Sequence, residues 1–332
     1  MRRVALVVLG LVAFLVLAGG LVIGWLLVFR PLTRPVTDRR FDATRQRLER
    51  GRYIVENLAA CIKCHSPNDL RKPVPGTEGS GWLLPVPHKN PLKHQIVAPN
   101  ITPDRDTGLG LWSDDEIGRA IREGVDRNGR SFGYAMPCLE YRKMSDEDLA
   151  SVVVYLRTLA PVRKALPETK LMFPVQYLAR LVPLPITSVV RRDQSSAEKR
   201  GEYLVALATC NGCHSPHDFA GHLLNGLEFS GGDVLRLDPA PTTVPNITPD
   251  ETGIKHATAE SFREMMRTGR WDGRMLHPLM PYDQYAKLTD ADLNDIYAYM
   301  RAVRPVKHVV DVTATATQCR ICKNQHGGGN QN

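Results

Sequence analysis

The apolar residues divide the chain into one long apolar segment and a series of shorter amphipathic ones. Val4–Phe29 contains no charged residue. At 1.5 Å per residue it would form about 39 Å of helix, enough to cross a hydrocarbon core of about 30 Å. We therefore predict an uncleaved transmembrane anchor within residues 1–30. A cleaved signal peptide is the alternative, although its apolar core is normally only about 7–15 residues long.

The remaining apolar positions have helical spacing. Ile54 and Leu58 lie four residues apart just before the first pair of cysteines. Ser113 and Ser145 each precede acidic residues, and serine followed by acidic side chains is typical of a helix start. Corresponding helices are expected over residues 258–268 and 289–303. No stretch alternates with period two for long, so the pattern predicts an all-α fold.

Two halves of the chain carry the same motifs in the same order. The motifs are Gly-x-Tyr from Gly51 and Gly201, Cys-x-x-Cys-His-Ser-Pro from Cys61 and Cys210, Pro-Asn-Ile-Thr-Pro-Asp from Pro99 and Pro245, and Met-Pro at Met136 and Met280. A repeat of this length indicates a duplicated domain. The predicted organisation is an anchor (1–30), a basic juxtamembrane stalk (31–50), domain 1 (51–165), a Pro-containing linker (166–196), domain 2 (197–310) and a polar tail (311–332).

Composition and charge exclude several classes of protein. The chain has 332 residues, of which 43% are hydrophobic and 23% charged, with a net charge of +8. These values are ordinary for a globular protein. The basic excess lies in the flanking and linking segments, so neither repeat offers the basic face of a nucleic-acid-binding domain. We interpret the arginine-rich stalk as a solvated segment, with docking to lipid headgroups or a partner subunit as the alternative.

Each repeat contains a Cys-x-x-Cys-His motif. The residues are Cys61, Cys64 and His65 in the first repeat, and Cys210, Cys213 and His214 in the second. This pattern is typical of c-type haem attachment, in which two thiols form thioether bonds and the adjacent histidine binds iron. A redox disulfide or half of a zinc site would also use Cys-x-x-Cys. Neither requires a histidine at the same place in both repeats, so we predict two covalently bound haem c groups.

The sixth iron ligand is assigned to Met136 and Met280. Of the nine methionines, these are the pair that matches across the repeats. The alternatives are His88, His94, His222, Met275 and His277. Ligation by histidine and methionine fills both axial positions, which favours one-electron transfer over catalysis at iron. We also expect a backbone carbonyl near each motif to accept the second N–H of the histidine and fix its tautomer.

Several other residues have positions that suggest a structural role. Gly51 and Gly201 are expected to let the first and last helices of each domain cross closely. Cys138 has Tyr282 as its counterpart and is interpreted as a buried thiol. Cys319 and Cys322 lie in the polar tail. We interpret this pair as a labile disulfide or a metal-binding tail rather than as a third haem site.

The two attachment motifs resemble those of class I-like cytochromes c. More narrowly, the Asn-Ile-Thr-Pro-Asp motif followed by Thr107–Trp112, together with Tyr134–Pro137, is similar to the cytochrome c subunits of membrane-bound bacterial alcohol, aldehyde and gluconate dehydrogenases. The resemblance implies that four polar residues of the Asn-Ile-Thr-Pro stretches line the haem pockets. They are Asn100, Thr102, Asn246 and Thr248. A purely structural Asx turn is the alternative for these residues.

The resemblance also implies partners and location. A periplasmic or membrane dehydrogenase would donate electrons, and another cytochrome or a terminal oxidase would accept them. Haem is attached on the outer face of the cytoplasmic membrane, so the haem domains are expected in the periplasm, although the arginines after the anchor favour the opposite orientation. We therefore expect an electron-transfer subunit with no nucleic-acid partner. The alternatives are a dihaem enzyme of the peroxidase or thiosulfate dehydrogenase type and a structural subunit that merely holds haem.

Overall fold

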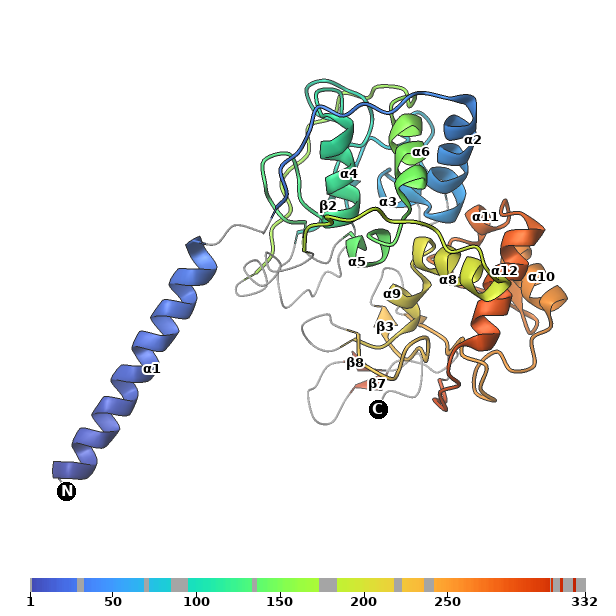
Figure 1. The fold of residues 1–332 in the computed structure, drawn as a ribbon. Coiled ribbons are helices and arrows are strands. Elements are labelled where there is room, and N and C mark those ends of the chain that lie inside the picture. The colour runs from blue at the N-terminus through green and yellow to red at the C-terminus, as the bar shows by residue number, and fades with distance from the viewer. Residues whose placement is uncertain are drawn as a thin grey trace.

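The structure is a computed structural model, and its description covers most of the chain (Figure 1). The described residues are 2–28, 33–68, 72–84, 95–132, 136–172, 184–217, 223–235, 242–310, 312, 317–318 and 325–326. Within them the chain is mostly helical, and its strands are only two residues long. The prediction of a helical protein is therefore confirmed, with small two-stranded sheets in the loops.

Helix α1 (Arg2–Val28) extends away from the rest of the molecule (Figure 1). Among the described residues, it is the one helix whose length and apolar character, over Val4–Trp25, would allow it to cross a membrane. Most of its apolar side chains, from Val4 to Trp25, are exposed. The helix therefore contributes no core to the body of the protein and is consistent with the predicted anchor.

The two halves of the body contain corresponding elements in the same order. In the first half these are α2 (Arg45–Tyr53), η1 (Ile54–Leu58), α3 (Cys61–Cys64), β1 (Trp82–Leu83), β2 (Val97–Ala98), α4 (Asp114–Glu123), α5 (Cys138–Tyr141) and α6 (Asp146–Leu156). In the second half they are α8 (Ala197–Leu207), α9 (Cys210–His214), β3 (Val234–Leu235), β4 (Thr242–Thr243), α10 (Ala259–Thr268), α11 (Tyr282–Tyr285) and α12 (Asp290–Ala302). The second half adds the hairpin of β5 (Arg270–Trp271) and β6 (Arg274–Met275), and β7 (Thr317–Gln318) pairs with β8 (Gln325–His326) near the C-terminus.

The expected helix starts are confirmed by their caps. Ser113 and Glu116 form a capping box at the start of α4, in which each side chain binds the other residue's backbone N–H. Ser145, Thr258 and Thr289 cap α6, α10 and α12 in the same manner, each accepting from the backbone N–H three residues later. The short polar side chain satisfies an amide that the helix itself leaves unpaired.

Gly51 and Gly201 allow two close helix crossings. A Cβ atom at Gly51 would lie 2.0 Å from the carbonyl oxygen of Ser151, and one at Gly201 would lie 1.9 Å from that of Asp295. Both distances are shorter than any non-bonded contact, so only glycine fits. The expectation that α2 packs on α6, and α8 on α12, through a glycine is confirmed.

One extra residue in the first half is absorbed by a π-helical turn. One residue more separates Gly51 from Cys61 than separates Gly201 from Cys210. In the first half η1 has π-type hydrogen bonds, such as the one from the Ala59 amide to the Ile54 carbonyl at 2.8 Å, whereas α8 is α-helical throughout. A π turn holds one residue more than an α turn. The π turn therefore accommodates the extra residue, so that both the glycine crossing and the cysteines of the first half stay in register with those of the second half.

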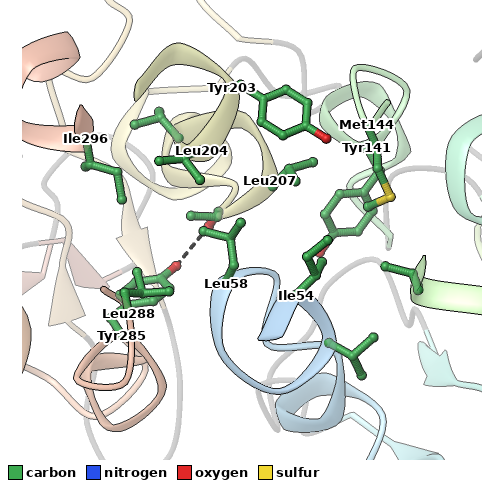
Figure 2. Close-up of a cluster of buried hydrophobic side chains, with 14 of the residues drawn as sticks. Ile54, Leu58, Tyr141, Met144, Tyr203, Leu204, Leu207, Tyr285, Leu288 and Ile296 are labelled. Carbon is green, nitrogen blue, oxygen red and sulfur yellow. Dashed lines mark hydrogen bonds between the residues drawn. The ribbon is translucent and has the colours of Figure 1, made fainter. Parts of the chain in front are cut away.

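The two halves share one hydrophobic core. Figure 2 shows Ile54 and Leu58 of η1 beside Leu204 and Leu207 of α8. Segments of both halves complete this cluster with two tyrosines, a methionine and a leucine, namely Tyr141, Tyr285, Met144 and Leu288. The contacts between the halves are reciprocal, because η1 packs on α11 while α8 packs on α5.

A tyrosine from each half reaches the helix start of the other half. The Tyr203 hydroxyl accepts from the Ser145 amide at 3.0 Å and donates to Asp148 at 2.7 Å, at the start of α6. Tyr53 makes the same pair of contacts at the start of α12. Its hydroxyl accepts from the Thr289 amide at 3.1 Å and donates to Asp292 at 2.5 Å. We name these two contacts the reciprocal tyrosine clasps. They relate the halves by an approximate twofold arrangement.

The arginine-rich segment before α2 lies against the first half rather than free in solvent. Arg34 pairs with Asp115 at 2.7 Å and with Glu123 at 2.8 Å, and the amide of Phe41 donates to Asp114 at 2.7 Å. Helix α2 also begins at Arg45, before the expected domain boundary at residue 51. The acidic first turn of α4 thus attracts a segment that we expected to be solvated.

Candidate haem-attachment sites

Each Cys-x-x-Cys-His motif forms a single helical turn with the same entry geometry. Ala60 and Thr209, which precede the first cysteine of each motif, both adopt the left-handed conformation, with φ of 46° and 56°. Such a conformation is uncommon for residues other than glycine and occurs often at functional sites. The sharp turn starts α3 and α9, so that both cysteines of each motif lie on one short helix.

The four motif cysteines are free thiols. Cys61 and Cys210 are half-buried, whereas Cys64 and Cys213 are exposed. Burial raises the pKa of Cys61 and of Cys210 to about 12, with a smaller contribution from the second cysteine of each motif. No disulfide joins the two cysteines of either motif. Two free thiols per motif fit the thioether chemistry of haem c.

The histidine rings are oriented by backbone carbonyls. The Nδ1 atom of His65 lies 2.8 Å from the Pro99 oxygen, and that of His214 lies 3.0 Å from the Pro245 oxygen. A carbonyl accepts but cannot donate, so Nδ1 carries the proton and Nε2 keeps a free lone pair. Burial lowers the pKa of both imidazoles, which keeps them neutral. Both rings therefore fit the role of an iron ligand through Nε2.

The Asn-Ile-Thr-Pro turns hold these carbonyls in place. The Asn100 side chain accepts from the Thr102 amide and hydroxyl, at 3.0 and 2.7 Å, and donates to the Val162 carbonyl at 2.7 Å. Asn246 makes the same bonds to Thr248 and Val306 in the second half, at 2.9, 2.8 and 2.9 Å. The side-chain bonds of these residues thus serve the turn, which places the preceding proline carbonyl beside the histidine.

The two methionines occupy equivalent turns. Met136 and Met280 are half-buried and pack against the shared core. The Met136 carbonyl accepts from the Cys138 amide at 2.7 Å, and the Met280 carbonyl accepts from the Tyr282 amide at 2.8 Å. Each turn leads directly into α5 or α11. The matching surroundings support the assignment of these methionines as a pair.

The structure describes only two of the alternative ligands, Met275 and His277. His88, His94 and His222 lie outside the described residues. Met275 is 44% exposed, on β6. The Nδ1 atom of His277 accepts from the Leu279 amide at 3.2 Å, so this ring is part of the turn that leads to Met280.

Cys61 and Cys210 of the two motifs both pack against the shared core. Burial raises the pKa of the Cys213 thiol, and the Cys64 thiol of the other half adds to this shift. Burial also raises the pKa of Tyr285 well above its ordinary value, and thiols of both motifs contribute. The Tyr285 hydroxyl donates to the Ala208 carbonyl at 2.9 Å (Figure 2). Sequence reasoning missed this tyrosine and Tyr141 as site residues, although their matching positions after Met-Pro were a signal.

The remaining cysteines are separate from the motifs. Cys138 is 2% exposed, and its Sγ lies 3.8 Å from the Ala120 carbonyl. The prediction of a buried thiol is confirmed. Cys319 and Cys322 lie outside the described residues.

Comparisons with known proteins agree with the motifs. Residues 198–304 match the family described as Cytochrome c. The chain is 28% identical over 285 residues to the fructose dehydrogenase cytochrome subunit of Gluconobacter japonicus, covering 81% of this chain and 55% of that protein. It is 29% identical over 277 residues to the gluconate 2-dehydrogenase cytochrome c subunit of Pantoea cypripedii, covering 77% and 59%. It is also 27% identical over 290 residues to a diheme cytochrome c-type protein of Cereibacter sphaeroides, covering 83% and 93%.

These findings confirm the predicted resemblance. Residues 198–304 match a cytochrome c domain, a kind of domain that binds haem c covalently, and the chain is similar to cytochrome c subunits of dehydrogenases. It spans somewhat more than half the length of the fructose and gluconate dehydrogenase subunits and nearly the whole of the diheme protein.

Proposed function

We propose that this chain is a membrane-anchored dihaem c-type cytochrome that relays single electrons. Residues 51–165 and 197–310 would form two tandem cytochrome c domains behind an anchor within residues 1–30. The observation that carries the proposal is the paired geometry of the motifs. In both halves a left-handed residue starts the cysteine turn, and a proline carbonyl holds Nδ1 of the histidine.

The ligand set follows from this geometry. Cys61 and Cys64 would hold one haem c and Cys210 and Cys213 the other. His65 and His214 would bind iron through Nε2, with Met136 and Met280 on the opposite side. Bound haem c supplies a metal that gains and loses one electron. The residues of the chain would fix the histidine tautomer, provide a methionine thioether as a further iron ligand and surround the site with apolar side chains, all of which would tune the potential.

The closeness of the two motifs supports transfer between the two sites within one molecule. Lys63 of the first motif reaches the Pro278 carbonyl of the other half at 2.8 Å, and the shared core and the reciprocal tyrosine clasps hold the halves together. An electron that enters at one site would therefore leave at the other without a change in domain arrangement.

The partners are proposed from the relatives. The fructose and gluconate relatives are named as cytochrome subunits of dehydrogenases, so a dehydrogenase in the membrane or periplasm is the proposed electron donor. Another cytochrome or a terminal oxidase is the proposed acceptor. Because haem c is attached on the outer face of the cytoplasmic membrane, the two domains would lie on the periplasmic side.

Two measurements on the purified full-length chain test the proposal. A pyridine haemochrome assay should give two haems per chain. Ferrous protein mixed with carbon monoxide should bind it slowly and weakly, because a methionine must first leave each iron. Rapid stoichiometric binding at either haem would instead favour a dihaem enzyme with an exchangeable site. Stopped-flow reduction by a candidate dehydrogenase should be fast, whereas a structural subunit would be reduced slowly or not at all.

A further inference from the structure

One lysine joins the first attachment motif to the methionine turn of the other half. Lys63 lies between Cys61 and Cys64 in α3. Its Nζ donates to the carbonyl oxygen of Pro278 at 2.8 Å, across a separation of 215 residues in the chain. Pro278 lies two residues before Met280, so the contact reaches the backbone that leads to the proposed sixth ligand of the second site.

The receiving turn is tightly hydrogen-bonded. The Met280 amide donates to the His277 carbonyl at 3.0 Å, and the Leu279 amide donates to Nδ1 of the His277 ring at 3.2 Å. The Tyr282 amide then donates to the Met280 carbonyl at 2.8 Å. These bonds link residues 277–282 into one unit. A displacement of the Pro278 carbonyl therefore moves Met280 as well.

The lysine is itself fixed at its backbone. The Lys63 amide donates to the Ala60 carbonyl at 2.9 Å, and the Asn68 side chain donates to the Lys63 carbonyl at 2.5 Å. Thioether bonds at the cysteines on either side of Lys63 would hold its Cα still more firmly. The counterpart of Lys63 in the second motif is Gly212, which has no side chain. Gly212 therefore cannot make the corresponding contact from the second motif to the methionine turn of the first half. Only the first motif is linked in this way to the other half.

We propose that Lys63 is a positioning residue for Met280, so that the first attachment motif holds the methionine turn of the second site closed. This inference rests on the proposed function, in which Met280 binds the second iron. A hydrogen bond from a charged donor to a carbonyl is stronger than one between neutral groups. Its loss shifts the turn towards the state in which Met280 is away from iron.

The test measures how easily carbon monoxide displaces the methionine in the ferrous full-length protein. Lys63→Met keeps the length of the side chain and removes the donor. We expect the carbon monoxide affinity of one of the two haems to rise about tenfold, since one charge-assisted hydrogen bond is lost from the closed turn. The thioether charge-transfer band of the ferric protein should weaken for that haem alone. Lys63→Arg, which keeps a cationic donor, should restore most of the original affinity.

A double-mutant cycle identifies the haem that responds. Met280→Ala alone should open the second site. If Lys63 acts through Met280, adding Lys63→Met to that variant changes the affinity no further. An unchanged affinity in Lys63→Met, an effect on the first haem, or an equal effect in the Met280→Ala background would each overturn the inference.

Two controls keep this test independent of folding and of the proposed function. Lys63→Gly copies the residue that the second motif already carries, and it serves as the second variant if Lys63→Met binds fewer than two haems. Lys199→Met removes an exposed lysine of α8 that pairs with Glu202 outside both motifs, and it should leave both haems unchanged. The wild-type protein is measured first. An open site or fewer than two haems there would overturn the proposed function as well, whereas a closed dihaem wild type with no Lys63 effect would overturn only this inference.

Discussion

At the scale of single residues, each proposed site depends on one carbonyl oxygen. The Pro99 carbonyl fixes the tautomer of His65, and Asn100 fixes the turn that carries the carbonyl. The asparagine thus acts on the ring without touching it. The same relationship holds between Asn246, Pro245 and His214 in the second half. A resemblance can suggest that these asparagines lie near the haem, but only the hydrogen bonds show how they would act.

The cysteine assignment predicts a change in haem content at one site. Cys210→Ala removes one of the two thioether bonds of the second site, so we expect that site to lose its haem or to bind it weakly. A pyridine haemochrome assay after acid–acetone extraction, which removes haem that is not covalently bound, measures the effect. Cys138→Ala is the matched control, because Cys138 is buried away from the motifs. Because Cys213 could still form one thioether bond, the decisive variant is Cys210→Ala with Cys213→Ala: if it still held two covalent haems per chain, the assignment of the motif would be wrong.

The methionine assignment predicts a change in potential at one site. Met136→Ala should leave both haems attached and lower the reduction potential of one, because thioether ligation raises the potential. A spectroscopic redox titration measures both centres in one experiment. Met275→Leu is the control, since Met275 is exposed on β6. Equal potentials in wild type and Met136→Ala would contradict the assignment, and a shift in Met275→Leu would favour the alternative ligand.

At the scale of elements, the helices were predictable where a local signal marks them. Ser113 and Ser145 start helices as expected, because a cap depends on residues within one turn. The π turn η1 was not predicted. The extra residue was visible in the alignment of the repeats, but nothing local distinguishes a π turn from a loop insertion. It forms because Gly51 and Cys61 are both held in register by tertiary contacts.

The contacts between the two halves could not be predicted from the sequence, and the reason is a different one. Lys63 meets Pro278, and Tyr203 meets Ser145 and Asp148, across large separations in the chain. Hydrophobic periodicity reports which face of a helix is buried, not what covers it. The repeat places corresponding motifs in the same order in both halves, but it contains no signal for how one half packs on the other.

The glycine crossings predict a large loss of stability from one added methyl group. Gly51→Ala would bring Cβ to 2.0 Å from the Ser151 carbonyl, so α2 must move away from α6. Overpacking of this kind costs about 1–3 kcal/mol, and occasionally more. Urea unfolding followed by circular dichroism measures the free energy. Lys199→Ala, at an exposed position of α8, is the control and should change the free energy of unfolding little, because exposed ion pairs contribute little. A Gly51→Ala protein as stable as wild type would contradict the close crossing.

At the scale of the whole molecule, the two halves form one body rather than two independent units. They share a continuous core, and the reciprocal tyrosine clasps bind each half to the first turn of the other half's last helix. Cys61 and Cys210 of the two attachment motifs both pack against this core. Side chains of both halves therefore set the distance between the proposed haems. Weakening the clasps would let this distance vary.

The clasps predict a loss of stability that depends on pH. Burial would raise the pKa of Asp148, but the ion pair with Arg50 and the hydrogen bond from Tyr203 outweigh it and hold the pKa below its ordinary value of 3.8. A carboxylate of this kind stabilises the fold above its ordinary pKa, and the contribution is lost as the pH falls through the lowered value. Tyr203→Phe removes the hydrogen bond to Asp148 and leaves the buried Ser145 amide without its acceptor. We expect a loss of about 1–3 kcal/mol near neutral pH.

The expected difference in unfolding free energy between wild type and Tyr203→Phe therefore narrows as the pH falls from 3.8 through the lowered pKa of Asp148, because this carboxyl then becomes protonated in the folded wild type as well. Urea unfolding at neutral pH and at a series of lower pH values measures this convergence. Tyr297→Phe is the matched control, because it also removes one tyrosine hydrogen bond, to the Ala257 carbonyl at 2.7 Å, but no carboxylate takes part. Its cost should stay constant with pH. If the two variants showed the same pH profile, the Asp148 carboxylate would not contribute to the clasp.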